Sequence, residues 1–291
     1  MHNLYKNKHN SYGILYVVAT PIGNINDITY RAVEVLSKVD LIATEDTRHS
    51  KKLLSFYGIN TRQISYHKHN ESKRSDYLID FLTNGKNVAL VSDAGTPAIS
   101  DPGDTLIAKA HKNNILVSPI PGACSVISAL CASGYGSNDF KFVGFLPKKK
   151  SQKTNILGSH KNKDYSLVFF ESPNRVIDTL EELKKIYTGD MILIIAREIT
   201  KIYEDVNMLR IDDWLEYYES NNNEKLKGEF VFIIPKKENF DNEIEYCEIE
   251  DFMKLLLENN ISYNTAVKIT CKNYDIKKNI IYNKYINLAK K

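Results

Sequence analysis

Short apolar runs, each followed by a turn rich in glycine or proline, recur along the first half of the chain. The run that ends at Ala19 leads into Thr20-Pro-Ile-Gly23, and the run from Val88 leads into Ser92-Asp-Ala-Gly-Thr-Pro97. Parallel strands that are buried on both faces have continuous apolar sequences, and ligands bind beyond their carboxyl ends. The pattern therefore predicts strands that end at a ligand cleft. An ordinary strand-to-helix turn with aspartate caps is the alternative for the second segment taken alone.

Apolar residues between these runs recur at helical spacing, so strands and helices alternate through the first half of the chain. The expected strands cover 15–19, 41–43, 88–91 and 115–117, and the expected helices lie near 27–39, 53–54, 72–82 and 106–110. Strands that alternate with helices form a parallel sheet with helices on its faces. We therefore expect an N-terminal α/β domain over residues 13–122.

The second half has fewer helical patterns for each strand. Strands are expected at 142–145, 166–170, 191–196 and 229–234, around one helix over 173–187. Pro173 suits the first turn of that helix, where its missing N–H is not needed. The low ratio of helices to strands favours a mixed sheet in a second α/β domain over residues 123–236.

The two ends of the chain differ from the α/β domains. Residues 1–12 are polar and rich in Asn and Lys, which predicts a flexible arm. Residues 237–249 are markedly acidic and indicate a linker. Three short amphipathic patterns follow at 250–257, 262–272 and 275–289, and they predict a small helical module of the helix-turn-helix type over residues 250–291.

The composition is that of a soluble globular protein, with 43% hydrophobic and 26% charged residues. Apolar runs such as 191–196 are far too short to cross a bilayer, and the N-terminus lacks the apolar core of a signal peptide. We therefore expect no membrane segment and a cytoplasmic protein. The four cysteines and seven histidines show no metal-binding spacing, so no metal site is predicted.

The charge is unevenly distributed along the chain, although the net charge is only +3. Residues 141–163 contain seven lysines and no carboxylate, and residues 264–291 contain seven lysines and a single acid, Asp275. A run of like charge usually marks a solvated face. Two basic segments nearly free of carboxylates nevertheless favour a polyanionic partner over a small neutral substrate.

The chain contains neither a G-x-G-x-x-G fingerprint nor a P-loop, which disfavours a conventional dinucleotide or nucleoside triphosphate site. Eight motifs in the same order resemble the ribosomal RNA small subunit methyltransferase I family, over about residues 13–235, and the tail resembles the C-terminal helix-turn-helix domain of that family. The motifs lie at 15–24, 45–48, 66–71, 92–103, 144–148, 170–175, 197–201 and 227–229.

The resemblance implies the tetrapyrrole-methylase fold and methylation of the ribose 2′-oxygen of a decoding-centre cytidine in 16S rRNA of the small ribosomal subunit. It also implies S-adenosylmethionine as methyl donor and a homodimer. The cofactor contacts that it transfers to this sequence are Pro21, Ala94, Gly95, Thr96, Pro97, Ile99, Cys124, Ser125 and Phe170. Each of these has an alternative reading as a core or turn residue.

The sequence departs from the family pattern at three positions. Asn174 stands where the family usually has His, Phe170 where Tyr is common, and Cys124 in a turn where Ser, Thr or another small residue is more usual. Asp93 and Asp101, within the predicted cofactor loop, are expected to cap turns rather than to take part in chemistry.

Polar residues at strand ends are the candidates for the reaction itself. Lys201, if desolvated at the mouth of the cleft, would have a lowered pKa and accept or relay the proton of the 2′-hydroxyl. Glu198 or Arg48 would orient the ribose and phosphate. A surface ion pair between Glu198 and Lys201 accounts for the same residues equally well. The expected phosphate contacts of the RNA are Lys148, Lys149, Lys150, Lys153 and Arg175.

Two other functions remain open at this level. The first is a methyltransferase of the same fold that acts on a tetrapyrrole of the precorrin type, which would need neither the basic segments nor the helical tail. The second is a non-catalytic rRNA-binding protein, which would not need an intact cofactor loop. The loop 92–103 is intact in this sequence.

Overall fold

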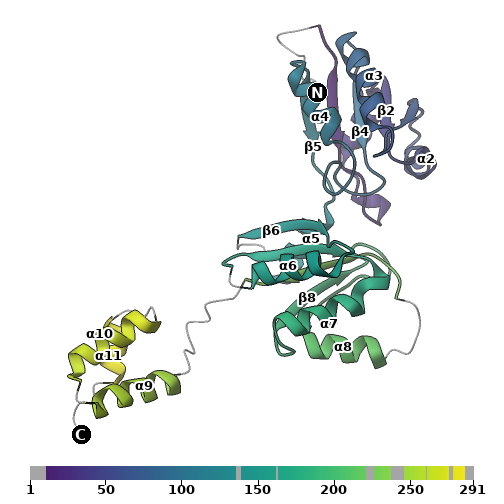
Figure 1. Cartoon of the computed structure of the whole chain (residues 1–291). Coiled ribbons are helices and arrows are strands. Elements are labelled where there is room, and N and C mark those ends of the chain that lie inside the picture. The colour runs from purple at the N-terminus through teal and green to yellow at the C-terminus, as the bar shows by residue number, and fades with distance from the viewer. Residues whose placement is uncertain are drawn as a thin grey trace. The chain divides into compact units, whose positions relative to one another are not determined.

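The computed structural model describes residues 11–135, 139–161, 163–220, 226–236, 246–259, 261–274 and 278–285. Residues 1–10 of the predicted arm, 237–245 of the predicted acidic linker and the end of the chain from 286 lie outside the described residues. The chain divides into two compact units, Met1–Lys236 and Lys237–Lys291 (Figure 1). Each unit is described by itself.

The first sheet of the larger unit is parallel throughout, as the apolar runs predict. Its strands lie in the order β3-β2-β4-β1-β5. They are β1 (Ile14–Val18), β2 (Leu41–Thr44), β3 (Gln63–Ser65), β4 (Val88–Val91) and β5 (Leu116–Ile120). Because β1 and β4 are neighbours at the centre of the sheet, the loops that follow them meet at its carboxyl edge.

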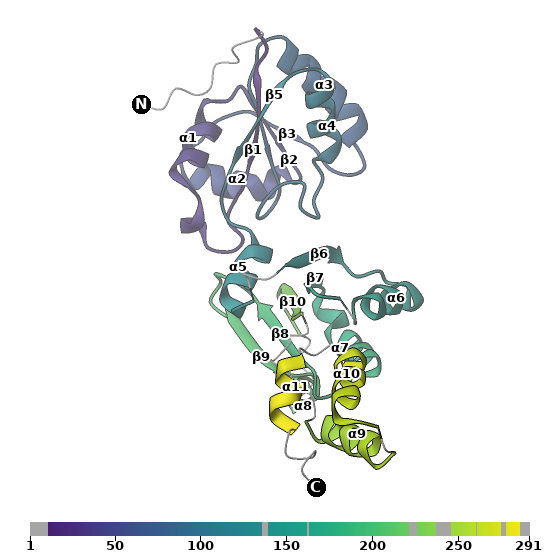
Figure 2. The same cartoon turned by 90° about the vertical axis from the view of Figure 1, so that its left-hand side faces the viewer.

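Helices cover both faces of the first sheet (Figure 2). The helices α1 (Tyr30–Lys38) and α2 (Thr47–Phe56) pack on one face, and α3 (Glu71–Thr83) and α4 (Asp104–Lys112) pack on the other. The helix expected near Asp27 begins later, at Tyr30, because the Thr29 hydroxyl caps it by accepting the Ala32 N–H at 3.1 Å. A short 3₁₀ turn, η1 (Ile25–Asp27), precedes it.

The second sheet is mixed, in agreement with the sequence. Its strands lie in the order β6-β7-β10-β8-β9, with β6 and β7 parallel and the remaining pairs antiparallel. The strands are β6 (Phe140–Phe145), β7 (Ser166–Glu171), β8 (Ile192–Arg197), β9 (Asp205–Arg210) and β10 (Phe230–Ile234).

Two layers of helix enclose the second sheet. The helix α5 (Ser125–Ser133) packs on one face, where Val126, Ala129 and Leu130 contact the strands. The other face is covered by α6 (Lys150–His160), α7 (Val176–Ile186) and α8 (Ile211–Ser220), and the short η2 (Pro173–Arg175) leads into α7. The first turn around Pro173 is thus 3₁₀, and the α-helix begins at Val176.

The smaller unit is helical, as predicted, but its first helix begins at Tyr246, within the residues 237–249 that were predicted to form a linker. It contains α9 (Tyr246–Glu258), α10 (Tyr263–Tyr274) and α11 (Lys278–Tyr285). These helices share one apolar core, to which Ile249, Met253, Val267 and Ile281 contribute. In the part of the chain that the structure describes, no helix combines the length and apolar character needed to cross a membrane.

Candidate functional site

The site begins where the loops after β1 and β4 cross. Thr20 and Gly95 exchange two backbone hydrogen bonds, of 2.9 and 3.1 Å, across the carboxyl edge of the first sheet. Gly95 has a φ of +79°, which favours glycine, and a Cβ there would lie 3.1 Å from Ile22. The Thr96 hydroxyl donates to the Ala123 carbonyl at 3.1 Å and ties this loop to the segment before α5.

Backbone strain is concentrated in the loops around this crossing. Ala98 and Ser100 in the β4 loop and Glu198 and Thr200 after β8 all have positive φ, between 51° and 70°. Such conformations are uncommon for residues with a side chain and persist only where the surroundings impose them. Four of the six positive-φ residues other than glycine in the described chain therefore lie in two loops.

A cavity of about 430 Å³ opens beside the β4 loop. Its lining comes from that loop, from the start of α5, from the ends of β6 and β7, and from the start of β10. The predicted cofactor residues that line it are Ala94, Gly95, Thr96, Ile99, Cys124, Ser125 and Phe170. Pro97 is buried and is not part of the lining, and Pro21 lines a second cavity instead.

Aromatic rings form one wall of this first cavity. The Phe170 ring lies 4.9 Å from Phe142 and 5.3 Å from Phe145, measured between ring centroids. Phe145 lines the cavity and remains 57% exposed, so its face is available to a ligand. Sequence reasoning missed Phe145, although an aromatic residue in the Gly144-Phe-Leu-Pro-Lys148 motif was the signal that marked it.

Carboxylates form another part of the lining. Glu45, Asp93 and Asp101 all line the first cavity. Burial and the negative charge of Glu45 raise the pKa of Asp101 to about 6. Burial and the charge of Asp93 raise the pKa of Glu45. These acids repel one another, so the cavity favours a cationic ligand. Asp93 and Asp101, expected to cap turns, thus contribute to the electrostatics of the cavity.

Glu198 and Lys201 form the ion pair that the sequence analysis gave as the alternative to a catalytic role. The Lys201 Nζ lies 2.8 Å from Glu198 Oε1 and 3.1 Å from Glu229 Oε2. Burial lowers the pKa of Lys201, but the hydrogen bonds and charges of Glu198 and Glu229 outweigh it, and the pKa is raised. The expectation of a lowered pKa at Lys201 is therefore wrong, because a lysine held by two carboxylates keeps its proton.

Several known proteins are similar to this chain over most of its length. The family model of the Tetrapyrrole (Corrin/Porphyrin) Methylases matches residues 14–212. Ribosomal RNA small subunit methyltransferase I of Haemophilus influenzae is 43% identical over 270 residues, which are 93% of this chain and 95% of that protein. The chain belongs to the ribosomal RNA small subunit methyltransferase I family.

Solved structures show that the family shares its fold with more distant enzymes. Diphthine synthase covers 77% of this chain and 90% of its own, with a TM-score of 0.60 and 15% identity. Cobalt precorrin-4 methyltransferase covers 76% of this chain and 94% of its own, with a TM-score of 0.54 and 17% identity. These likenesses concern the fold alone.

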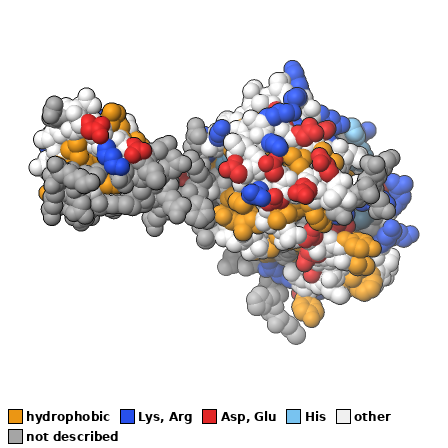
Figure 3. Space-filling model, turned by 90° about the horizontal axis from the view of Figure 1, so that it is seen from below, with side chains coloured by type: hydrophobic (Ala, Val, Ile, Leu, Met, Phe, Trp, Pro, Cys, Tyr) orange, Lys and Arg blue, Asp and Glu red, His pale blue; other side chains and the backbone are white. Residues whose placement is uncertain are grey.

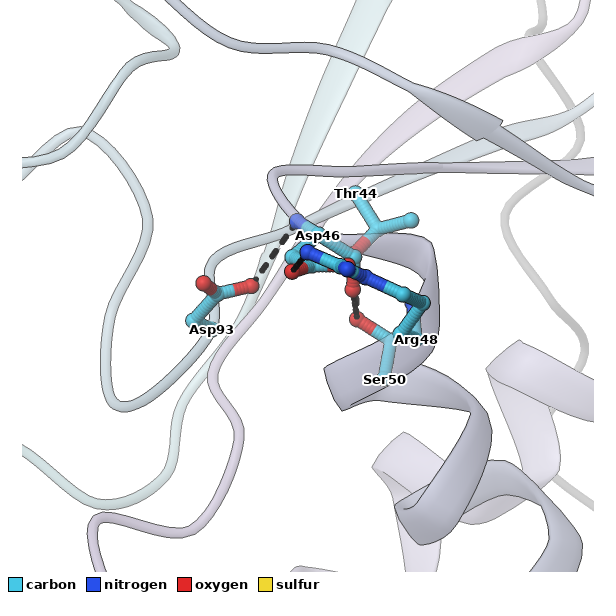
Figure 4. A network of polar contacts seen from close by, with 5 residues as sticks. All are labelled: Thr44, Asp46, Arg48, Ser50 and Asp93. Carbon is cyan, nitrogen blue, oxygen red and sulfur yellow. Dashed lines mark hydrogen bonds and ion pairs between the residues drawn. The ribbon is translucent and has the colours of Figure 1, made fainter.

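In this family member, the Arg48 side chain lies against Asp46 at the start of α2 (Figure 4). Its side chain is 90% exposed and pairs with Asp46 at 2.8 Å, and the hydrogen bond from Arg48 lowers the pKa of Asp46 to about 2. Asp46 caps α2, and its backbone N–H donates to Asp93 Oδ1 at 2.9 Å. Arg48 is not among the residues that line either cavity, so the structure does not place it beside Lys201.

The predicted RNA contacts separate into two groups. Lys148, Lys149 and Lys150 are exposed at the start of α6. Lys153 is buried, and its ammonium donates to the Thr179 hydroxyl at 3.3 Å. Arg175 donates to the carbonyls of Leu146 and Pro147 and pairs with the buried Glu171.

Lys153 and Arg175 therefore hold α6 and the loop before it in place rather than facing a partner, which corrects the prediction that they contact phosphates. Their long side chains satisfy buried oxygens, a role that composition does not distinguish from RNA binding. Acidic and basic side chains are interspersed on the face drawn in Figure 3, so this face is not uniformly basic.

Proposed function

We propose that this protein transfers a methyl group from S-adenosylmethionine to the ribose 2′-oxygen of a decoding-centre cytidine in 16S rRNA of the small ribosomal subunit. The observation that carries the proposal is the first cavity, lined by the loop after β4, the start of α5 and the end of β7. The names of the curated relatives, which specify methylation of small subunit rRNA, support the same reaction.

The chemistry of the first cavity suits S-adenosylmethionine, which combines a flat adenine ring with two positive charges. Phe145, Phe170 and Ile99 provide apolar surface for the ring. Asp93 and Asp101 provide carboxylates that favour the sulfonium and ammonium groups. A ligand with several phosphates would be repelled by the same acids. This agrees with the lack of a phosphate-binding glycine motif in the sequence.

S-adenosylmethionine brings a methyl group that is already activated, so the protein acts mainly by positioning the acceptor oxygen and excluding water. Gly95 lets the ligand approach the backbone of the β4 loop closely. In this proposal Lys201 stays protonated and contacts the ribose or its phosphate, while Glu198 and Glu229 hold its ammonium in place. Arg48 contacts a phosphate farther from the reacting atoms, because its guanidinium is solvent-exposed.

The RNA is held mainly through its phosphates in this proposal. Lys148, Lys149 and Lys150 are exposed lysines close in sequence to Phe145 of the first cavity. Phosphate contacts carry little sequence information, so recognition of the cytidine depends on the cleft and on the shape of the assembled subunit. We further propose that the enzyme acts as a homodimer in the cytoplasm, where ribosomal subunits are found.

Two measurements test the proposal. Calorimetry should detect binding of S-adenosylmethionine, and mapping of 2′-O-methyl groups after incubation with unmethylated small subunits should find one new methylated cytidine. Binding of the methyl donor without RNA methylation, together with methylation of a precorrin, would assign the protein to tetrapyrrole chemistry. Subunit binding without affinity for the donor would identify a non-catalytic RNA-binding protein.

A further inference from the structure

A second cavity, of about 280 Å³, adjoins the first. It lies between α1, α2 and the ends of β1 and β4. Four residues line both cavities: Ile22, Asp93, Ala94 and Glu229. A transfer between two substrates requires that the acceptor atom lie within reach of the donated group. Two cavities that share a wall meet this requirement, because the donor can occupy one cavity and the acceptor the other.

The lining of the second cavity suits one nucleotide. Leu36, Leu54 and Val91 are buried and supply apolar surface for a flat base. His49, Lys52 and Lys201 add groups that can bind ribose or phosphate oxygens. The volume is just below the range of about 300–1,000 Å³ for drug-sized ligands, which fits a single nucleoside better than a tetrapyrrole ring system.

We propose that the second cavity receives the target nucleotide, extruded from its RNA, and that Asp93 accepts the proton of the 2′-hydroxyl. This inference rests on the function proposed above. The ribose oxygen forms a bond to the methyl carbon while the carbon–sulfur bond breaks and its electron pair goes to sulfur. The hydroxyl proton passes to the Asp93 carboxylate and from there to water. Enzymes that modify a base or nucleotide within folded RNA commonly extrude it into a pocket in this way.

Asp93 is the shared residue best placed for this role. Its Oδ1 accepts the Asp46 N–H, which fixes the carboxylate between the two cavities and leaves Oδ2 as the proton acceptor. Glu229 also lines both cavities, but its Oε2 is bound to Lys201 and its side chain is 74% exposed. Asp101 lines only the first cavity.

Filling the second cavity tests its occupant. Leu53→Trp on α2 and Ile25→Trp in η1, both in the lining, should each lower kcat/KM for methylation of small subunits by at least ~100-fold, with nearly normal affinity for S-adenosylmethionine. Ser55→Trp, at an exposed position of the same helix, is the matched control and should behave like wild type. Ile25→Trp decides the question if Leu53→Trp fails to fold.

A readout independent of turnover is fluorescence from small subunits that carry pyrrolocytidine at the target position. Extrusion of the modified base from the stack should raise its fluorescence when the wild-type protein binds. The two cavity-filling variants should abolish this rise. Normal methylation and normal fluorescence in both variants would overturn the inference while leaving the proposed function intact. A wild-type protein that does not methylate small subunits would instead refute the proposed function.

Asp93→Asn tests the proton acceptor. The amide oxygen can still accept the Asp46 N–H, so the loop keeps its anchor, but the side chain can no longer take a proton. We expect kcat to fall by at least ~100-fold with little change in KM for the subunit. Asp104→Asn in the first turn of α4 is the control for the chemical change alone. A kcat within about threefold of wild type in Asp93→Asn would exclude this role for Asp93.

Discussion

The side chain of Lys201 packs across the Cα atom of Gly23, so that a Cβ at Gly23 would lie only 2.4 Å from Lys201 Cγ. Gly228 plays the same part for Glu198, where a Cβ would lie 2.6 Å from Glu198 Cγ. Two glycines from distant parts of the chain thus make room for one ion pair. The Gly23 loop follows β1, and Gly228 precedes β10, so the pair links the two sheets of the larger unit.

Gly23→Ala should therefore displace Lys201 without disturbing the first cavity. We expect a drop of about 10-fold in kcat/KM for RNA methylation and an unchanged affinity for S-adenosylmethionine. Steady-state kinetics and calorimetry measure the two quantities. Gly158→Ala on α6 is the matched control, because no atom lies within 4 Å of the added methyl group there. Wild-type kinetics in Gly23→Ala would show that the position of Lys201 does not matter for the reaction.

Lys201 should act as a fixed positive charge rather than as a base. Burial lowers its pKa, but Glu198 and Glu229 raise it further, so the ammonium stays protonated throughout the neutral range. We expect Lys201→Arg to retain most of the rate and Lys201→Met to lose at least ~100-fold.

The pH dependence provides an independent check on Lys201. Between about pH 6 and pH 9 the rate profile of Lys201→Arg should have the same shape as that of the wild type, because neither side chain titrates there. An alkaline limb that is present in the wild type and missing in Lys201→Arg would restore the lysine as a general base.

The sequence predicts a part of this site only where the residues that form it are close together along the chain. The loop after β4 was predicted to line a ligand cleft because its glycine, prolines and small residues directly follow a buried strand. Glu229 as a partner of Lys201 was not, because the two residues are 28 positions apart and meet only through the antiparallel pairing of β8 with β10. The buried Lys153 and the half-buried Arg175 were misassigned because the sequence does not distinguish a basic residue that binds oxygens within the fold from an exposed one.

The sequence patterns did not predict β3, β9 and α6, and each of these omissions has a physical reason. β3 is three residues long and half-buried, and β9 is an edge strand whose polar residues interrupt any apolar run. On α6 only Leu157 is a fully buried apolar side chain, so its lysines dominate the pattern. Long apolar runs such as β1, β4 and β10 were recognised because burial on both faces leaves little room for polar residues.

Asp101 should make the protein less stable as the pH rises. Burial and Glu45 raise its pKa in the folded protein to about 6, above its ordinary value of 3.8, so the folded state binds the proton more tightly than the unfolded state. Stability is then lost as the pH rises from about 4 to about 6. Asp101→Asn should be more stable than wild type at pH 7 by about 1–2 kcal/mol, after allowance for solvent screening, and equally stable near pH 3.5.

Urea unfolding at the two pH values measures this difference. Asp101 faces Glu45, Asp93 and Lys68 in addition to Ser92, so the Glu45→Gln variant should lower the pKa of Asp101 and reduce the effect. Equal stabilisation by Asp101→Asn at both pH values would mean that the ionisation of Asp101 is not its cause.

Gly95→Val should abolish binding of S-adenosylmethionine. Gly95 has a φ of +79°, and a Cβ there would already lie 3.1 Å from Ile22, so a branched side chain both strains the loop and enters the first cavity. Calorimetry should show no binding, while far-UV circular dichroism stays close to that of the wild type. Binding retained in the micromolar range would place the donor site elsewhere.

The exposed lysines before and at the start of α6 should set the salt dependence of RNA binding. Each phosphate contact that is lost should reduce the slope of log K against log salt concentration by about 0.7–0.9, so a Lys148, Lys149 and Lys150 triple substitution to Ala should lower the slope by roughly two to three. Lys112→Ala, at an exposed position near the end of α4, should leave the slope unchanged. Filter binding of small subunits at several salt concentrations gives the slopes. A triple variant with a wild-type slope would move the RNA contact to another surface. Lys153 and Arg175, in contrast, bind oxygens inside the fold, so their substitution should lower the thermal stability of the protein instead.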